Sequence, residues 1–154
     1  MSDLLRVILF LPLAAALLLH GSRHWMRVGT LVVTLVVLGL TANLVARYSN
    51  AAQETGFAAE SDDSWLKLAD SAINIHFSIA IDGLSLWLFA LTALLSVVAV
   101  LVSWEAIEQR ASLFYRLLLL LETGMLGVFV ARDIILFYVF FEFTLIPLFF
   151  LIGL

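Results

Sequence analysis

The chain has 154 residues, of which 64% are hydrophobic and 13% charged, and its mean hydropathy is +1.12. Soluble domains are closer to half apolar and a quarter charged, so this composition is typical of a membrane protein. Twelve acidic against eight basic residues give a net charge of −4, which argues against a nucleic-acid-binding surface. Because there is no cysteine, disulfides, thiolate metal sites and cysteine-ligated iron–sulfur clusters are excluded.

Five stretches are apolar and long enough to cross a membrane as helices of roughly 20 residues. In chain order they cover about residues 4–19, 25–46, 83–104, 113–131 and 134–154. We therefore predict an all-α, polytopic bundle of about five transmembrane helices. Helices one and two form a first part (1–46), an extramembrane segment follows (47–82), and helices three to five form the last part (83–154).

The first segment is short and carries Arg6 ahead of its apolar run, as a signal peptide does. No clear small-residue cleavage site follows Leu19, so we predict a retained helix with a kink at Pro12. Basic residues are divided equally between the two sides of the membrane. The first connection is very short and contains Arg23 and Arg27, which favours placing it in the cytoplasm and the N-terminus outside.

The segment 47–82 is too polar to enter lipid, since it contains Glu54, Glu60, Asp62, Asp63 and Asp70. Its residues 73–81 alternate large apolar with small or polar side chains, a pattern that predicts a half-buried strand in a small surface hairpin. Asp82 precedes the third apolar stretch and is followed by Gly83 and Ser85. We interpret it as a helix N-cap rather than a ligand.

Glu142 is the first of two acids deep within a predicted span. At 1.5 Å per residue it lies about 12 Å from the start of its helix, near the middle of the membrane. An acid at that depth needs a proton, a basic partner or a water-filled cavity, and each of these is also what proton transfer requires. We therefore favour a proton-pathway role over a structural hydrogen bond. Pro147 would weaken the helix just beyond the acid and help to admit water.

Glu122 is the second intramembrane acid. It and Glu142 are each ten residues from Arg132 in the turn between the last two spans, so both carboxyl groups should lie at a similar depth. If they shared an interface, their like charges would oppose simultaneous ionisation. The sequence does not decide whether they face each other. It also leaves open whether Glu122 has a proton-pathway role or a packing role. Gly124 and Gly127 predict a close approach between helices.

Four blocks of sequence resemble the antiporter-like membrane subunits of respiratory complex I, the proton-pumping NADH:quinone oxidoreductase, and in particular the M chain, called chain 4 in mitochondria. They are residues 77–85 (FSIAIDGLS), 103–105 (SWE), 120–129 (LLETGMLGVF) and 137–147 (FYVFFEFTLIP). The resemblance covers about half of the chain. It implies that Glu142 is the family's key glutamate on the fifth helix, which pairs with a lysine on the seventh. Glu122 is similar to an acid that a subgroup carries on its fourth helix.

The family has roughly fourteen helices, and its later lysines have no counterpart here, so residues 83–154 would be only the start of the antiporter-like repeat. We therefore expect an N-terminal fragment of the subunit, whether split or truncated, that contributes to proton translocation coupled to electron transfer from NADH to quinone. Expected partners are lipid, other membrane subunits of the complex and a polypeptide supplying the missing helices. NADH, FMN, iron–sulfur clusters and quinone would all bind elsewhere, and no metal site is expected on this chain.

Two alternatives stay open. One is the D-type component of an Mrp-type cation/proton antiporter, which resembles the M chain throughout this region. The other is a truncated structural or non-functional copy. In the leading interpretation the chain lies in the bacterial plasma membrane, or in the inner mitochondrial membrane if it is organellar.

Overall fold

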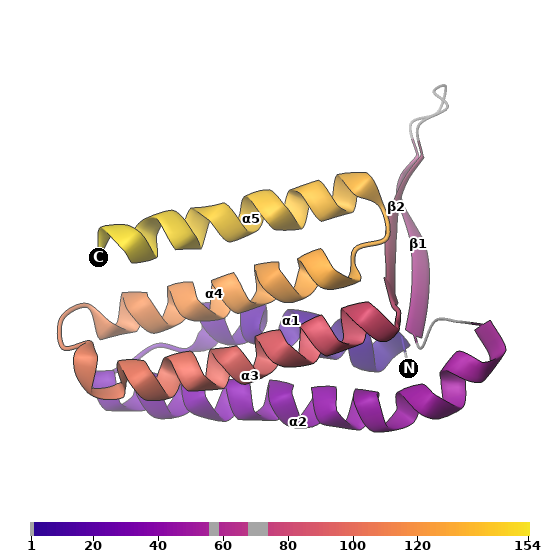
Figure 1. The fold of residues 1–154 in the computed structure, drawn as a ribbon. Coiled ribbons are helices and arrows are strands. Elements are labelled where there is room, and N and C mark those ends of the chain that lie inside the picture. The colour runs from indigo at the N-terminus through magenta and orange to yellow at the C-terminus, as the bar shows by residue number, and fades with distance from the viewer. Residues whose placement is uncertain (1, 56–58, 68–73) are drawn as a thin grey trace.

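The computed structural model describes residues 2–55, 59–67 and 74–154, with side-chain surroundings for residues 2–48 and 78–154. Five helices and a two-stranded hairpin make up the described part of the chain. In chain order these elements are α1 (Ser2–Leu18), α2 (Arg23–Thr55), β1 (Ala59–Lys67), β2 (Asn74–Ile81), α3 (Gly83–Ala106), α4 (Ala111–Val130) and α5 (Ile134–Gly153). The helices lie side by side in one bundle, with α5 packed on α4 and the hairpin at the end where α3 and α5 begin (Figure 1). The predicted all-α bundle is confirmed.

Four helices within the described residues are long and apolar enough to cross a membrane. They cover Arg23–Tyr48, Gly83–Ala106, Ala111–Val130 and Ile134–Gly153. The predicted first span is also a helix, α1, but its 17 residues reach only about 25 Å at 1.5 Å per residue, the short end of what can span the hydrocarbon core. Pro12 lies inside this helix and is buried.

Helix α2 is longer than the sequence pattern predicted. The predicted span ends at residue 46, but the helix continues to Thr55, so the first nine residues of the predicted extramembrane loop are helical. Residues 47–55 contain neither proline nor glycine, and Ala51 and Ala52 are among the best helix formers, so nothing local ends the helix where hydrophobicity falls.

The predicted hairpin is confirmed. β1 and β2 pair antiparallel, with Ala59 opposite Ile81 and Lys67 opposite Asn74, and a bulge lies between Ser64 and Leu66. Residues 68–73, including the acid Asp70, lie outside the described residues, as do the side chains of the other predicted loop acids, Glu54, Glu60, Asp62 and Asp63.

The end of β2 is buried on both faces, whereas the alternating pattern predicted burial on one. Ile79 and Ile81 are fully buried, and Ser78 and Ala80, on the opposite face of the strand, are also buried. The cause is the turn between α4 and α5, which lies against this strand: the Arg132 backbone N–H donates to the Ser78 carbonyl oxygen at 3.0 Å, and Ile79 forms an isolated bridge with Ala131. The hairpin is therefore attached to the helix bundle at its base.

Asp82 is the N-cap of α3, as predicted. Its backbone is extended, and its carboxylate accepts a hydrogen bond of 2.7 Å from the Ser85 backbone N–H. This bond satisfies one of the amide groups that have no partner within the first turn of a helix. Because it favours the ionised carboxylate, it also holds the pKa of Asp82 below the ordinary value of 3.8.

We predict that Asp82→Ala lowers the free energy of unfolding by about 1 kcal/mol at neutral pH, the usual value of an N-cap. Since the pKa is lowered in the folded state, the stabilisation is complete above the unfolded pKa and is lost as the pH falls through the folded value. Unfolding in detergent micelles at about pH 7 and about pH 2 measures both effects. Asp82→Asn is the matched control: it keeps the cap, and the pH-dependent part should vanish. An equal loss in Asp82→Ala at both pH values would contradict the capping mechanism.

The buried core consists of two apolar clusters. The hairpin-end cluster unites all five helices and β2, and its buried members are Leu5, Ile8, Leu9, Val37, Leu44, Ile79, Ile81, Leu86, Phe89, Ala93, Leu126, Val130, Leu136 and Phe140. The loop-end cluster is smaller and lies towards the opposite end of α2, α3 and α4; its buried members are Met26, Val100, Ala111 and Tyr115.

Two arginines join the connections at the loop end of the bundle. The Arg27 guanidinium donates to the Ile107 carbonyl oxygen at 3.0 Å, at the end of α3, and lies over the Trp104 ring. Arg116 donates to the Leu19 carbonyl oxygen at 3.1 Å, just beyond α1, and its side chain also bonds His20 Nδ1. Both charges therefore satisfy carbonyl groups near helix C-termini, where positive charge is favourable.

Candidate functional site

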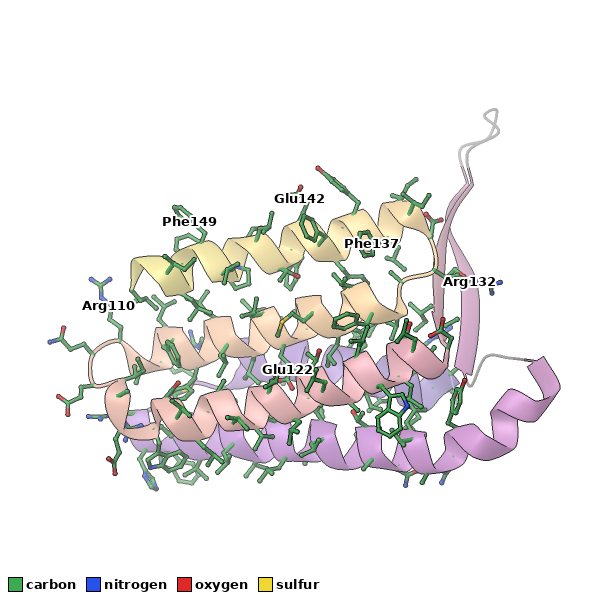
Figure 2. All side chains as sticks on the ribbon, viewed as in Figure 1. Arg110, Glu122, Arg132, Phe137, Glu142 and Phe149 are labelled. Carbon is green, nitrogen blue, oxygen red and sulfur yellow. The ribbon has the colours of Figure 1, made fainter. Side chains whose placement is uncertain are left out.

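Glu142 lies on the outer face of α5. This helix begins at its N-cap Asp133, whose carboxylate accepts from the Ile135 backbone N–H at 2.8 Å, and its buried side chains are Leu136, Phe140 and Pro147. Glu142 is exposed and points away from α4 (Figure 2). Only 17% of the most apolar stretch of α5 is buried, against 50% for the corresponding stretch of α4. The face of α5 that carries Glu142 is therefore not covered by the described residues.

Tyr138 accompanies Glu142 on this face. It precedes the acid by four residues, about one helical turn, and its hydroxyl group lies near the Glu142 carboxyl group. Tyr138 is 60% exposed, and Glu142 is also exposed, so both side chains are accessible to any polypeptide or lipid that lies against α5. Sequence reasoning missed Tyr138; the i, i+4 spacing within an otherwise apolar span was the available signal.

Pro147 does not end α5. The helix runs without interruption from Ile134 to Gly153, with Pro147 inside it and buried. A proline in a helix has no N–H for the carbonyl group four residues earlier, which here belongs to Phe143. The predicted local weakening is thus confined to this carbonyl group, on the residue next to Glu142.

Glu122 has a different environment, although it lies on the neighbouring helix. Its side chain is 1% exposed, and neither carboxyl oxygen has a hydrogen-bond partner in the structure. Ser96 of α3 is its polar neighbour, and Figure 2 places Glu122 between α4 and α3. The acid therefore points into the bundle.

The two acids do not share an interface. The side of α4 that faces α5 carries Gly124 and Gly127, which lie against Thr144 and Phe140 of α5. Glu122 points towards α3 on another side of α4, and Glu142 points outwards from α5 (Figure 2). The close helix approach predicted from the two glycines is confirmed, whereas the conditional expectation of like-charge opposition between the acids does not apply.

The structure offers no metal-binding cluster within the residues it describes: nowhere there do three His, Asp or Glu side chains come together. The bundle interior, however, contains further buried polar side chains that sequence reasoning passed over. Thr30 and Thr34 of α2 are fully buried, and Ser96 of α3 is nearly so. Regularly spaced Thr and Ser within apolar spans were the signal, but their common burial depends on how the helices pack.

The chain is similar over nearly its whole length to subunits of NADH-quinone oxidoreductases. It is 35% identical over 164 aligned residues to NADH-quinone oxidoreductase subunit M of Rhodobacter capsulatus, covering 99% of this chain and 30% of the relative. It is 32% identical to NADH-ubiquinone oxidoreductase chain 4 of Mycosarcoma maydis, covering 97% of this chain and 31% of the relative. Over 82 residues it is 49% identical to subunit M of Pseudomonas aeruginosa, covering 53% of this chain and 16% of that protein. No protein-family model matches the chain.

The fold also occurs in a solved structure. A chain of the membrane-bound sulfane sulfur reductase, an archaeal respiratory membrane complex, matches with a TM-score of 0.68 and 21% identity, covering 94% of this chain and 22% of that one. At this identity the match shows a shared fold. By sequence the chain is similar over its own length to NADH-quinone oxidoreductase subunit M and chain 4, and it spans about 30% of the length of these relatives.

Proposed function

We propose that the chain is part of a membrane subunit of a proton-pumping NADH:quinone oxidoreductase, and that Glu142 is a proton-pathway group in it. The observation that carries the proposal is the match at 32–35% identity over 97% or more of the chain to subunit M and chain 4. The chain contributes no redox centre of its own in this proposal. NADH, FMN, iron–sulfur clusters and quinone bind to other parts of the assembly.

The exposed position of Glu142 supports a partner on α5. A charged carboxylate facing lipid at mid-membrane costs about 2.5–3.5 kcal/mol on insertion scales, so the Glu142 face of α5 is unfavourable against hydrocarbon. A further polypeptide that covers this face with a basic side chain would relieve the cost and stabilise the ionised carboxylate. Moving that cation relative to Glu142 would then bind or release a proton. The assembly would lie in the bacterial plasma membrane, or in the inner mitochondrial membrane of an organellar complex.

The first test asks which proteins accompany the chain. Native mass spectrometry of gently solubilised membranes should find it together with NADH dehydrogenase activity and with a polypeptide that supplies the remaining helices. A chain found without these partners contradicts the proposal. Sodium-dependent proton exchange without coupling to NADH would instead indicate the cation/proton antiporter.

The second test concerns Glu142 itself. In membrane vesicles containing the assembled complex, Glu142→Gln should reduce NADH-driven proton uptake by about a hundredfold or more, because a positioned proton-transfer group contributes about two or more orders of magnitude in rate. Glu105→Gln is the matched control, since Glu105 is an exposed acid at the end of α3. If proton uptake is as fast in Glu142→Gln as in Glu105→Gln, Glu142 is not a proton-pathway group and the chain has only a structural role.

A further inference from the structure

A layer of polar side chains separates the two apolar clusters of the core. On α2, Thr30 and Thr34 lie between Met26 of the loop-end cluster and Val37 of the hairpin-end cluster. We call Thr30, Thr34, Ser96 and Glu122 the polar layer. All four side chains are at most 4% exposed.

The other two helices place their members at the same level of the bundle. On α3, Ser96 lies between Ala93 of the hairpin-end cluster and Val100 of the loop-end cluster. On α4, Glu122 lies between Tyr115 and Leu126, which belong to the loop-end and hairpin-end clusters. Three helices thus interrupt their apolar faces at one depth.

The polar layer has more hydrogen-bond acceptors than donors. The Ser96 hydroxyl donates to the Thr92 carbonyl oxygen at 3.0 Å, and the Thr34 hydroxyl donates to the Leu31 carbonyl oxygen at 3.0 Å, so the protons of both are used within their own helices. Thr30 Oγ1 and both oxygens of Glu122 have no partner. Buried polar atoms in proteins are nearly always satisfied, by protein or by internal water. This layer needs donors, and a protonated carboxyl group and water both supply them.

Within the described residues, no cationic side chain is bonded to the Glu122 carboxyl group. The Arg27 and Arg116 guanidinium groups are bonded to carbonyl oxygens at the loop end. Arg6, next to Leu5 on the first turns of α1, has an interaction of its own and is not among the groups that act on the Glu122 carboxyl group. Glu142, the other acid at this depth, faces away from the bundle (Figure 2). A buried carboxylate without a cationic partner is costly, so the carboxyl group should keep its proton.

We propose that Glu122, Ser96, Thr30 and Thr34 form an internal site that binds a proton on the Glu122 carboxyl group together with one or a few water molecules. The proton is shared with bound water, which also donates to the free lone pairs of the layer. The site lies on the α2–α3 side of α4 and is separate from the Glu142 face of α5. It goes beyond the proposed function, because it depends on the interior of this chain and not on its assembly into an oxidoreductase.

Infrared spectroscopy of the full chain in lipid nanodiscs tests the site directly. At neutral pH the spectrum should contain the carbonyl stretching band of a protonated carboxylic acid. Glu122→Gln should remove this band, whereas Glu142→Gln should leave it in place. If Glu122→Gln leaves the spectrum of this region unchanged, Glu122 is ionised and the proposal is wrong. The readout does not involve NADH or quinone, so its outcome is independent of the proposed function.

Transfer to D2O tests the bound water. The Glu122 band should shift to the frequency of a deuterated carboxyl group, because water in the layer exchanges its protons. A band that stays at its original frequency after the backbone amides of the loop end have exchanged indicates a dry, closed site and overturns the hydration part of the proposal.

Two conservative variants show whether the neighbouring hydroxyl group belongs to the site. Ser96→Ala removes one member of the polar layer with little change in volume, and it should shift the frequency of the Glu122 band and slow its exchange in D2O. Thr41→Val is the matched control: Thr41 is a fully buried threonine of α2 that bonds its own helix at Val37, outside the layer. Equal spectra for the two variants would contradict the assignment. Should Glu122→Gln fail to fold, the response of the wild-type band to Ser96→Ala assigns it.

Discussion

Replacing Gly127 by leucine should lower the free energy of unfolding by about 3 kcal/mol, the upper part of the range for overpacked interiors. Even a single Cβ atom at this position would overlap the Phe140 ring of α5, close to its attachment point. Helix α5 buries only Leu136, Phe140 and Pro147, so few other contacts compensate if Phe140 is displaced. SDS-induced unfolding in mixed micelles measures the change.

Gly39→Leu is the control for this substitution. Gly39 is an exposed residue of α2, and a Cβ atom there would meet nothing within 4 Å, so the effect should stay within about 0.5 kcal/mol. The double variant Gly127→Ala with Phe140→Ala should be more stable than the sum of the single changes predicts, by about 0.5–3 kcal/mol, because the second change removes the overlap. Additive effects would mean that α4 and α5 do not approach each other at Gly127.

Features set by neighbouring residues were predictable from the sequence. The strand after residue 73, the capping role of Asp82 and the existence of the helices each depend on a local pattern: alternation, a carboxylate before a helix, or a run of apolar residues. The end of α2 was not predictable from hydropathy, because a helix does not stop where its side chains become polar. Its continuation to Thr55 follows from helix propensity instead.

The directions of the two acids could not be predicted, for a geometric reason. Equal spacing from Arg132 sets the depth of Glu122 and Glu142, but direction depends on which sides of α4 and α5 are in contact. Gly124 and Gly127 decide this, since they allow α5 to approach α4 on a side that excludes both acids. A one-residue shift of the glycines would rotate that contact around α4 by about 100° and change which side chains of α4 face α5.

The polar layer was likewise hidden in the sequence. Thr30, Thr34 and Ser96 are ordinary residues of apolar helices, where hydroxyl groups commonly bond their own backbone. Their significance comes from lying at the same depth as a carboxyl group without partners, and this depends on how α2, α3 and α4 pack together.

Replacing Glu122 by leucine should raise the free energy of unfolding by about 1–3 kcal/mol, the cost of leaving a buried polar group imperfectly satisfied. Leucine has a similar reach and would join Leu119 and Leu126, its fully buried neighbours along α4. Such a gain means that the acid opposes stability in the folded chain, which is expected of a group that serves proton binding and not packing. SDS titration of both proteins in the same micelles measures the difference.

The opposite kind of change, an acid introduced in place of a buried leucine of α4, provides the comparison. Leu119→Glu places a second acid one turn earlier, nearer the loop-end cluster, and should lower stability by about 2.5–3.5 kcal/mol, the insertion cost of a charge at mid-membrane. If Glu122→Leu also lowers stability, the Glu122 carboxyl group forms stabilising hydrogen bonds, and its role is structural. If Glu122→Leu raises stability while Glu122→Gln leaves it nearly unchanged, the difference measures the cost of keeping any polar group at this position. In that case the polar layer does not contribute to folding, and a function must account for its cost in stability.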